Sequence, residues 1–577
     1  MPMEHRAASR EPHDGARPTS RDRSCRHDAA RPVTTAARPE FGAANRPAFI
    51  EALAREAFDV LVIGGGIVGA GVARDAAMRG LRVALVEQSD FASGTSSRSS
   101  RLVHGGLRYL ENGQLHLVFE ASQERRTLMR IAPHIVRPLQ FLWPVFDGAR
   151  IPTWKLRAAL TLYDALALFR NVAPHHALDA AAVSTLEPAL RRPGLRGGAT
   201  YFDAATDDAR LTLLNARAAH DAGAVVVTRV RADGLLLEAH AVRGARAHDI
   251  IGNQSFDIAA RCVVNATGPW SDTIRRFAQP NATASVRGTK GVHLALPAER
   301  VGNAGALTLL SPIDGRVFFV LPSGATTIVG TTDTDYDGDP EAVCATPTDV
   351  AYLLRSVDAY FPAACLTPDD VIAAWAGIRP LVGGDARQPD ALSREHAVTT
   401  TAPGLITVSG GKLTTYRVMA RDTVNAVQRS LGQRVSEAPT GSVALPGGAA
   451  NIDAQLEQAA KRTGSRALAA HLVHRYGGEW AGVWSLAEAD GALAVPLVPP
   501  LPYIRAEVSW AVAREMALSL GDVLMRRVPL AWQLADHGAA LADTIAPAYG
   551  WSAADVAEYV RDAALVLGAP GRGYACA

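Results

Sequence analysis

The sequence predicts an α/β fold built around a dinucleotide-binding unit, with a β-rich insertion and a helical C-terminal region. Three observations lead to this prediction. Between residues 58 and 87, a β-branched apolar strand, a GxGxxG turn, a helix and a second strand ending in an acid follow one another. Between about residues 285 and 335, apolar residues alternate and turns are frequent. After about residue 450, amphipathic helical patterns alternate with Gly/Pro loops.

The stretch from residue 58 to residue 87 carries the nucleotide-binding signal. Gly64 allows the tight turn from strand to helix, Gly66 lets the backbone approach a pyrophosphate, and Gly69 lets the helix pack closely on the strand. The N-terminus of that helix offers free N–H groups to phosphates. Glu87, at the end of the next strand, can accept hydrogen bonds from ribose hydroxyls. This order of elements indicates a dinucleotide, FAD or NAD, and argues against a Gly-rich surface loop.

The composition is that of a globular protein with more than one domain. The chain has 577 residues, of which 48% are hydrophobic and 20% charged, and its net charge is +2 at pH 7. This balance excludes the strongly basic surface that nucleic-acid binding needs. The five cysteines are far apart, odd in number and without a CxxC pair. They are interpreted as reduced thiols of a cytosolic protein, and the sequence shows no metal-ligand spacing.

Residues 1–54 are expected to form a disordered tail. They are rich in Arg, Ala, Pro, Ser and Thr and lack apolar periodicity, so they cannot bury enough apolar surface to become ordered. The tail has no signal-peptide core, and its acidic residues argue against an organelle transit peptide. A disordered extension, or a start codon assigned too early, explains it. No apolar run in the chain reaches transmembrane length.

A hydroxyl-rich loop and a charged motif follow the second strand. Residues 93–100 are small and polar and lie past the carboxyl end of a strand, where ligands bind in open α/β sheets. On composition alone, a flexible surface loop fits equally well. The next motif places His104, Arg108 and Tyr109 beside two glycines, which favours a binding site. A titratable ring, a fork of donors and a phenol together suit a small anionic ligand.

Residues 115–170 are expected to be largely helical and mix aromatic with basic side chains. Trp154 and Phe169, for example, lie near Lys155 and Arg157. This mixture is typical of a monotopic membrane face. The alternative, which the residues alone favour, is a core helix pair with a solvated rim.

Three later segments carry further candidate residues. A strand leads into the small turn at residues 266–271, where a second backbone segment can approach a dinucleotide. His293 lies on the first strand of the predicted antiparallel sheet, and Arg379 and Arg394 follow it; a structural role fits each of them too. Lys412 stands between a glycine pair and a helix start, where a cation and free N–H groups face an anion or an electron-rich ring.

A set of motifs along the chain matches one enzyme family. In order, they are GGGIVGAGVARDAAMRG, SGTSSRSSRLVHGGLRYLE, DDARL, VVNATGPW, KGVHLALP, VGTTDTDYDGDP, GIRPL, LSREHAV and GGKLTTYR. Together they resemble the FAD-dependent, quinone-linked glycerol-3-phosphate dehydrogenases. The match is close over roughly residues 55–435 and looser in the helical C-terminal region, and the N-terminal tail does not share it.

The resemblance implies a glutathione-reductase-like FAD-binding Rossmann domain interleaved with an antiparallel β-sheet substrate domain, plus a C-terminal α-helical domain. The interleaved domains would span residues 55–441, with the substrate sheet mainly in 110–200 and 285–390, and the helical cap 442–577. FAD would be held by Gly64, Gly65, Gly66, Gly69, Glu87, Ser96, Ser97, His104, Gly105, Gly106, Ala266, Thr267, Gly268, Gly411, Lys412, Leu413 and Thr414.

The resemblance also implies the reaction. Hydride transfer from C2 of sn-glycerol 3-phosphate to FAD would give dihydroxyacetone phosphate, with the electrons passed to a quinone. Arg379 and Arg394 would hold the phosphate, because a guanidinium fork binds phosphate through two hydrogen bonds. Arg108 and Tyr109 would contact the hydroxyl end, and two histidines are candidates for accepting the C2 hydroxyl proton. The implied catalytic residues are Arg108, Tyr109, His104, His293, Arg379 and Arg394.

Rival interpretations stay open at this stage. A glycerol-3-phosphate oxidase would deliver electrons to O₂, and no residue separates it from the dehydrogenase. An amine- or hydroxy-acid-oxidising flavoenzyme of the same fold would not need two phosphate-binding arginines. A non-catalytic flavin-binding or membrane-docking protein is a further alternative. For the enzyme, a cytoplasmic location with peripheral attachment to the inner face of the cell membrane is expected, and a homodimer is compatible with the sequence.

Overall fold

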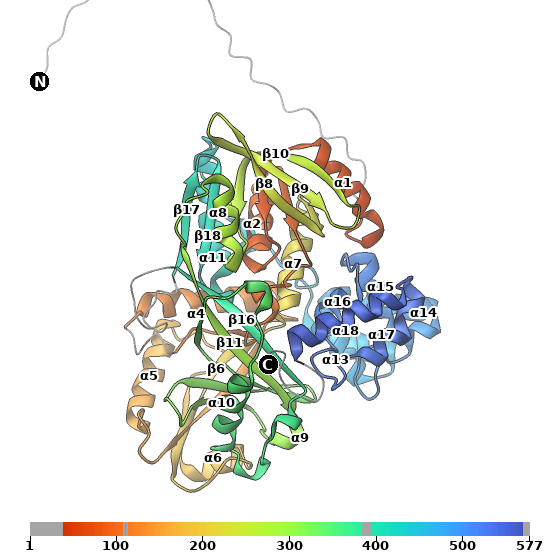
Figure 1. Ribbon diagram of the computed structural model, residues 1–577. Coiled ribbons are helices and arrows are strands. Elements are labelled where there is room, and N and C mark those ends of the chain that lie inside the picture. Colours follow the sequence, from red (N-terminus) through yellow and green to blue (C-terminus); the bar gives the residue numbers. More distant parts are fainter. Residues whose placement is uncertain (1–38, 108–109, 111–112, 383–394, 569–577) are drawn as a thin grey trace, which may run out of the picture. The chain divides into compact units, whose positions relative to one another are not determined.

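Two β-sheets and a group of C-terminal helices make up the described part of the chain (Figure 1). The structure, a computed structural model, describes residues 39–107, 110, 113–382 and 395–568. From Glu40 onward the chain forms one compact unit. This arrangement confirms the predicted fold class. The chain passes back and forth between a nucleotide-binding sheet and a second sheet before the helical region begins.

The first sheet has a parallel centre. Its strands run in the order β17-β18-β10-β1-β2-β7, with the β8–β9 hairpin added to β10. β1 pairs in parallel with both β2 and β10, so the carboxyl ends of these strands share one edge, where ligands bind in such sheets. The strands are β1 (Ala57–Ile63), β2 (Val83–Glu87), β7 (Val225–Thr228), β8 (Val230–Glu238), β9 (Ala241–Asp249), β10 (Gln254–Asn265), β17 (His396–Ala402) and β18 (Leu405–Gly410).

Helix α2 (Ile67–Met78) begins directly after β1 and packs between α7 (Asp208–Asp221) and α11 (Tyr416–Ser430). Its small residues permit this close packing. A Cβ atom on Gly69 would lie 1.9 Å from the backbone oxygen of Gly64, so only glycine fits there. Gly64 itself has φ +109°, a conformation that glycine adopts without strain. The sequence therefore fixes the turn that brings the N-terminus of α2 to the sheet edge.

The second sheet is assembled from two stretches of the chain, residues 102–205 and 286–382. Its order is β15-β11-β14-β13-β12-β4-β6-β3, with β16 added to β11 and β5 to β6. Among the described pairs, only β12 and β4 run parallel. The strands are β3 (Leu102–Val103), β4 (Arg137–Phe146), β5 (His176–Leu178), β6 (Leu195–Ala205), β11 (Val286–Pro297), β12 (Ala306–Leu310), β13 (Val317–Ser323), β14 (Thr326–Gly330), β15 (Thr334–Tyr336) and β16 (Ala373–Val382).

Helices cover these sheets, and further helices form the C-terminal region (Figure 1). The remaining helices before residue 442 are α1 (Arg46–Arg55), α4 (Leu115–Ile131), α5 (Thr153–Leu166), α6 (Ala180–Leu186), α8 (Ser271–Ala278), α9 (Ala298–Val301) and α10 (Pro347–Asp358). Those after it are α12 (Ile452–Thr463), α13 (Arg466–Tyr476), α14 (Trp480–Ala489), α15 (Arg505–Arg514), α16 (Leu520–Asp522), α17 (Ala539–Ile545) and α18 (Ala553–Leu567).

Buried ion pairs join the C-terminal helices to the nucleotide-binding part. Arg210 on α7 binds both carboxylate oxygens of Glu515, at 2.6 and 2.9 Å, and both side chains are fully buried. Asp90, in the loop after β2, accepts hydrogen bonds from Arg526 and Arg527. Removing one partner from such a buried pair leaves an uncompensated charge, which is strongly destabilising. The helical region is therefore an integral part of the fold.

Three sequence-based expectations need correction. The expected disordered tail reaches residue 54, but helix α1 occupies residues 46–55; Phe49 and Leu53 are buried, and Arg46 binds Asp249 at 2.5 Å. The stretch 115–170 is not helical throughout, because β4 separates α4 from α5. The cysteines are not all free: Cys344 is disulfide-bonded, whereas two other cysteines are free thiols.

Candidate active site

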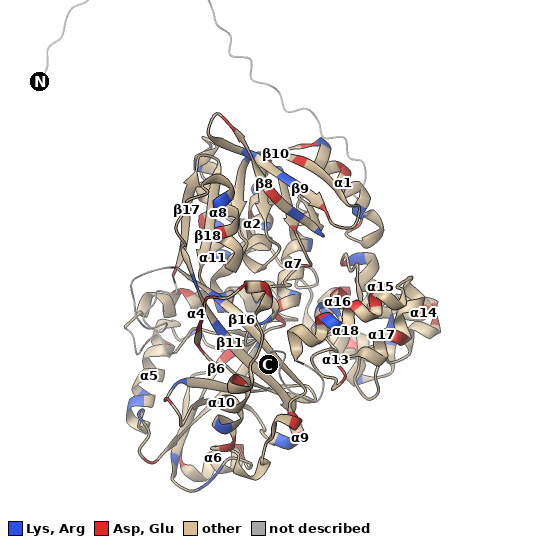
Figure 2. Ribbon diagram, viewed as in Figure 1, with Lys and Arg blue, Asp and Glu red and all other residues tan. Residues whose placement is uncertain are grey.

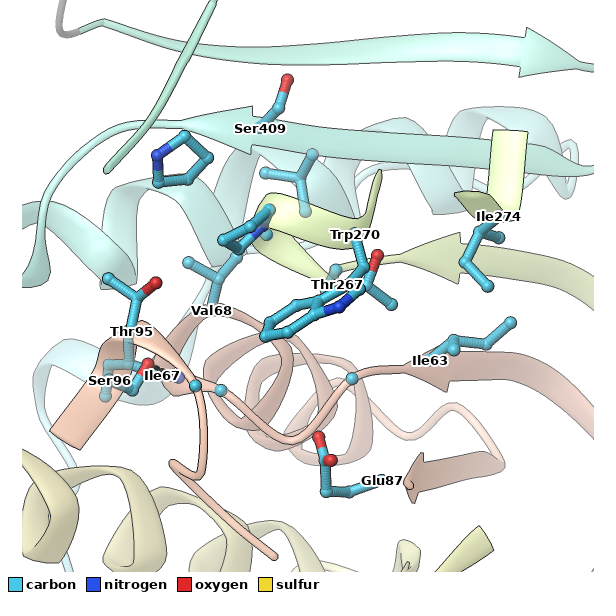
Figure 3. Close-up of a pocket in the computed structure, with 18 of the residues that line it drawn as sticks. Ile63, Ile67, Val68, Glu87, Thr95, Ser96, Thr267, Trp270, Ile274 and Ser409 are labelled. Atoms are coloured by element: carbon cyan, nitrogen blue, oxygen red, sulfur yellow. Dashed lines mark hydrogen bonds between the residues drawn. The ribbon is translucent and has the colours of Figure 1, made fainter. Parts of the chain in front are cut away.

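A cavity of about 550 Å³ lies at the carboxyl edge of the first sheet. Its wall is formed by the β1–α2 turn, the end of β2, the loop at residues 93–96, the turn at 266–270 and residues 408–413. Figure 3 shows side chains from these segments converging, with Glu87 at the end of β2 and Trp270 from the 266–270 turn. Its volume lies within the usual range of ligand pockets.

Glu87 closes one side of the cavity and is held by backbone donors. Its carboxylate accepts hydrogen bonds from the N–H of Gly65 at 2.7 Å and of Ser89 at 2.8 Å. Burial raises the pKa of Glu87, while these two N–H groups act in the opposite direction. The carboxylate lines the cavity with its position fixed from behind, as a hydrogen-bond acceptor for sugar hydroxyls requires.

The N-terminus of α2 faces the same cavity. Gly66, Ile67 and Val68 line it, and the hydroxyl of Ser96 accepts a hydrogen bond from the Ile67 N–H at 3.0 Å (Figure 3). No acidic residue lies in the first turn of α2, so no carboxylate of the helix competes with a phosphate for the positive end of the helix dipole. This end of the cavity is suited to a pyrophosphate.

The residues present fit FAD. The wall of the cavity includes Arg231 and Asp233 of β8, Glu87, the N-terminus of α2, and Lys412 at the start of the short helix η8 (Leu413–Thr415). An acidic side chain, helical N–H groups and a cation therefore line one cavity. They match the needs of a ribose, a pyrophosphate and an electron-rich ring.

Most of the predicted cofactor-binding residues belong to this cavity or support it. Gly65 and Gly69 shape the turn beneath it, and Ser97 is buried beside Ser96. The hydroxyl of Thr414 accepts a hydrogen bond from the backbone N–H of His104 at 3.2 Å, so Thr414 ties two loops together. The predicted residues that line the cavity are Gly64, Gly66, Glu87, Ser96, Ala266, Thr267, Gly268, Gly411, Lys412 and Leu413.

A second, smaller cavity has a volume of about 170 Å³ and comes within one residue of the first along β16. Arg379 lines the second cavity and the next residue of β16, Pro380, lines the first. The remaining walls come from the residues on both sides of β3, from strands of the second sheet and from the segment after β14. Its polar wall residues include Ser100, His104, Tyr201, Thr308, Arg316 and Arg379. Two carboxylates also line this space, and they are paired: Asp203 with Arg125, and Asp333 with Arg379. An anionic ligand in the cavity would bind the guanidinium groups of Arg316 and Arg379.

Arg379 is held in place by the segment after β14. Its Nη1 donates to the carboxylate of Asp333 at 3.1 Å, and its Nη2 donates to the Thr331 hydroxyl at 2.9 Å. Arg316, from the turn between β12 and β13, donates to the backbone oxygen of Asp333. The two cations are thus oriented by one short segment, which fixes their geometry before a ligand binds.

His293 on β11 lies behind the cavity wall. Its Nε2 is 2.8 Å from the Ser100 hydroxyl, and its ring stacks on Trp375 with a centroid distance of 5.4 Å. Burial, and then the positive charges of Arg379 and Arg101, lower the pKa of His293 to about 3. The imidazole is therefore neutral at physiological pH.

The His104–Gly105–Gly106 turn is fixed by a buried network. The backbone N–H of Gly105 donates to the Tyr163 hydroxyl at 3.0 Å and to the Asp203 carboxylate at 3.1 Å. Tyr163 donates to Asp203 at 2.7 Å, and Arg125 pairs with the same carboxylate. A Cβ on Gly105 would lie 2.3 Å from the Tyr163 hydroxyl oxygen. His104 and Gly106 consequently line the second cavity, rather than the first.

Sequence reasoning and structure differ on which residues form the site. Three predicted residues, Arg108, Tyr109 and Arg394, lie outside the described residues. Ser100 and Arg316 line the second cavity but were not predicted. Ser100 could have been found, because it ends the hydroxyl-rich loop. Arg316 carries no motif, since only the pairing of β12 with β13 brings it to the site.

Comparisons with known proteins cover both sheets and the helical region. The family model of FAD dependent oxidoreductases matches residues 59–422, and that of the C-terminal domain of alpha-glycerophosphate oxidase matches residues 438–556. Glycerol-3-phosphate dehydrogenase 2 of Mycobacterium tuberculosis is 40% identical over 528 residues, which cover 89% of each chain. Glycerol-3-phosphate dehydrogenase of Synechocystis is 36% identical over 518 residues, covering 86% of this chain and 94% of the relative.

A solved structure agrees with these matches. The glycerol-3-phosphate dehydrogenase from Bacillus halodurans, complexed with FAD, superposes with a TM-score of 0.75 at 29% identity. The superposition covers 91% of this chain and 98% of that one. The likeness therefore extends through the first sheet, the second sheet and the C-terminal helices alike.

Proposed function

Because this chain belongs to the FAD-dependent glycerol-3-phosphate dehydrogenases, we propose that it oxidises sn-glycerol 3-phosphate to dihydroxyacetone phosphate and passes the electrons to a respiratory quinone. One observation carries the proposal: an arginine-bearing cavity adjoins the cavity that fits FAD, with Arg379 and Pro380 as neighbours on β16. A phosphate bound by Arg379 would hold the substrate's carbon chain beside the cofactor ring.

The predicted catalytic side chains have distinct roles in the proposed reaction. Arg379 binds the phosphate together with Arg394, which lies outside the described residues. Arg108 and Tyr109 orient the hydroxyl end, and His293 is the base toward which the proton of the C2 hydroxyl moves. FAD, when bound, accepts the hydride from C2. The protein supplies position and charge, and fixing the reacting atoms in register lowers the barrier.

The cofactor end relies on backbone groups and on Lys412. Glu87 binds the ribose, and the α2 N-terminus binds the pyrophosphate. Lys412 adds positive charge where the ring system lies, which favours electron uptake there. Gly411 has φ +77°, and a Cβ on it would lie 2.3 Å from the Met419 sulfur. Only glycine therefore fits at this position next to Lys412.

An anaerobic titration tests the assignment. Purified, FAD-loaded protein should lose its flavin absorbance when glycerol 3-phosphate is added in stoichiometric amount, and dihydroxyacetone phosphate should appear in equal quantity. Sarcosine and D-amino acids should cause no bleaching, since they lack the phosphate. Bleaching by an amine, but not by glycerol 3-phosphate, would identify an amine-oxidising enzyme instead.

The electron acceptor is tested in the second half of the same experiment. Adding a water-soluble quinone analogue to the reduced protein should restore the flavin absorbance faster than air-saturated buffer does. Stoichiometric peroxide, with no stimulation by the quinone analogue, would instead assign the chain as a glycerol-3-phosphate oxidase.

A face around α5 supports peripheral attachment to a membrane. Trp154 and Phe169 expose 71% and 73% of their surface, and Leu168 is also exposed. Lys155 and Arg157 lie on the same helix, where Figure 2 shows blue basic segments. Within the described ranges, no helix has the length and hydrophobicity that crossing a bilayer requires. Aromatic residues beside bases suit the surface of an anionic membrane.

Liposome flotation tests this face. The wild type should float with vesicles that contain anionic lipid, and a Trp154→Ser, Phe169→Ser double variant should remain at the bottom. Leu565→Ser is the matched control, because Leu565 is an exposed apolar residue of α18, far along the chain. Equal flotation of all three proteins would exclude the α5 face as the attachment surface.

A further inference from the structure

The base and the substrate cavity are separated by one side chain. His293 is only 3% exposed and does not line the second cavity, whereas Ser100 does. The Ser100 hydroxyl lies 2.8 Å from Nε2 of His293. A substrate hydroxyl in the cavity would therefore meet the oxygen of Ser100 before it could reach the imidazole.

The surroundings of His293 fix its orientation. Trp375 stacks on one side with an interplanar angle of 13°, and a Cβ on Gly330 would lie 2.2 Å from the ring, so the imidazole cannot swing into the cavity. Among the described residues, Nδ1 has no hydrogen-bond partner. With the ring fixed in this way, the hydrogen bond between Nε2 and Ser100 is the route by which a proton can leave the cavity.

We propose that Ser100 is a catalytic residue that relays the proton of the substrate's C2 hydroxyl to His293. This inference rests on the proposed function. In the step, the substrate O–H bond breaks as an O–H bond to Ser100 Oγ forms, and the original Ser100 proton moves to Nε2 of His293. The C2–H bond breaks with its electron pair, which passes as hydride to the bound FAD, and C2 becomes a carbonyl carbon.

The charged groups around Ser100 and His293 affect the protonation of His293. Arg379 and Arg101 are the cations that act on His293, and each is accompanied by an acid: Asp333 pairs with Arg379, and Asp208 lies near Arg101. Together with burial, these two cations keep the imidazole neutral. A phosphate dianion on Arg379 offsets that positive charge, so substrate binding itself increases the proton affinity of His293.

Stopped-flow reduction by glycerol 3-phosphate tests the relay. Ser100→Ala should slow flavin bleaching about 100-fold at pH 7, the lower bound for losing a general base, and the rate should rise with pH. Ser100→Thr, which keeps a hydroxyl, should stay within about threefold of wild type. Ser356→Ala is the control, because it removes a buried hydroxyl that pairs with Ser311, outside both cavities, and its rate should not change.

A double variant distinguishes a relay from two independent groups. If Ser100 and His293 act as one unit, Ser100→Ala combined with His293→Gln should be no slower than His293→Gln alone. A proton inventory, in which the rate is measured in mixtures of H₂O and D₂O, can be made on the wild type. If two protons move in the same step, the rate depends on the deuterium fraction along a curve and not a straight line.

The outcomes separate the relay from the proposed function. Loss of bleaching in the wild type would overturn the proposed function itself. Wild-type bleaching with a linear inventory, or with Ser100→Ala as fast as wild type, would overturn only the relay, and His104, which lines the cavity directly, would become the base.

Discussion

The two cavities are built by different means. In the first, the part that suits a pyrophosphate is formed by backbone, with the glycines at 64 and 66 and the N-terminus of α2, all from one local motif. The second is bounded by side chains from segments far apart in the chain, such as Ser100, Arg316 and Arg379. A widely used cofactor is bound through groups that every residue possesses. A particular substrate requires particular side chains, which only the sheet register brings together.

The largest expected effect is on the backbone-built cavity. Gly69→Ala would place a Cβ 1.9 Å from the Gly64 oxygen, which neither backbone segment can avoid. We expect a loss of stability of at least about 3 kcal/mol and almost no bound FAD, measured by thermal unfolding and the flavin-to-protein ratio. Gly491→Ala, where a Cβ meets nothing within 4 Å, should behave like wild type. A stable, yellow Gly69→Ala protein would contradict the packing argument.

The next effect is on the side-chain cavity and should leave the cofactor unaffected. Arg379→Ala removes a charge held by Asp333 and Thr331, and we expect KM for glycerol 3-phosphate to rise about 100- to 1000-fold. Arg379→Lys should recover part of this loss, since a lysine keeps the charge but not the fork. The FAD content should equal that of Arg300→Ala, an exposed arginine paired with Asp370. An unchanged KM would remove Arg379 from the phosphate site.

A smaller effect is expected from a change in the first cavity, which should weaken FAD binding and leave KM for the substrate unchanged. Glu87→Gln keeps the shape of the side chain but replaces an acceptor oxygen with a donor, facing the N–H groups of Gly65 and Ser89. The Kd for FAD, from quenching of flavin fluorescence by apoprotein, should rise about 10- to 100-fold. KM for glycerol 3-phosphate in FAD-saturated protein should not change. If KM rose instead, the two cavities would be coupled more closely than their construction indicates.

The smallest effect near neutral pH is the dependence of stability on pH. Burial lowers the pKa of both His134 and His293 to about 3, below the ordinary value of 6.5. The unfolded chain therefore binds more protons between these values, and stability falls as the pH drops below 6.5, by up to about 1.4 kcal/mol per pH unit for each histidine. Asp208, whose pKa burial raises to about 6, acts in the opposite direction.

The variant His134→Phe isolates one of these contributions. Its melting temperature should fall less than that of the wild type between pH 7 and pH 5. His116→Gln removes an exposed histidine and should follow the wild-type curve. Parallel curves for His134→Phe and wild type would mean that His134 is not buried in its neutral form.

The fold and the cofactor cavity could be predicted because their signals are local. The spacing of Gly64, Gly66 and Gly69 and the position of Glu87 identify the turn without reference to the rest of the chain. The second cavity could be predicted only where a motif marks a residue, as for His104 and Arg379. Arg316 could not, since its place depends on which strand pairs with β12. The burial of His293 could not be predicted either, because it depends on the stacking of Trp375 from another strand.

The ion pairs of Asp90 with Arg526 and Arg527 affect when the nascent chain can bind its cofactor. Asp90 precedes the loop that lines the first cavity, yet its partners are synthesised 436 and 437 residues later. Until they arrive, a carboxylate destined for the interior has no counter-charge, and that loop lacks its support. We therefore expect flavin capture to be a late, post-translational step, so that nascent chains released at residue 441 emerge colourless.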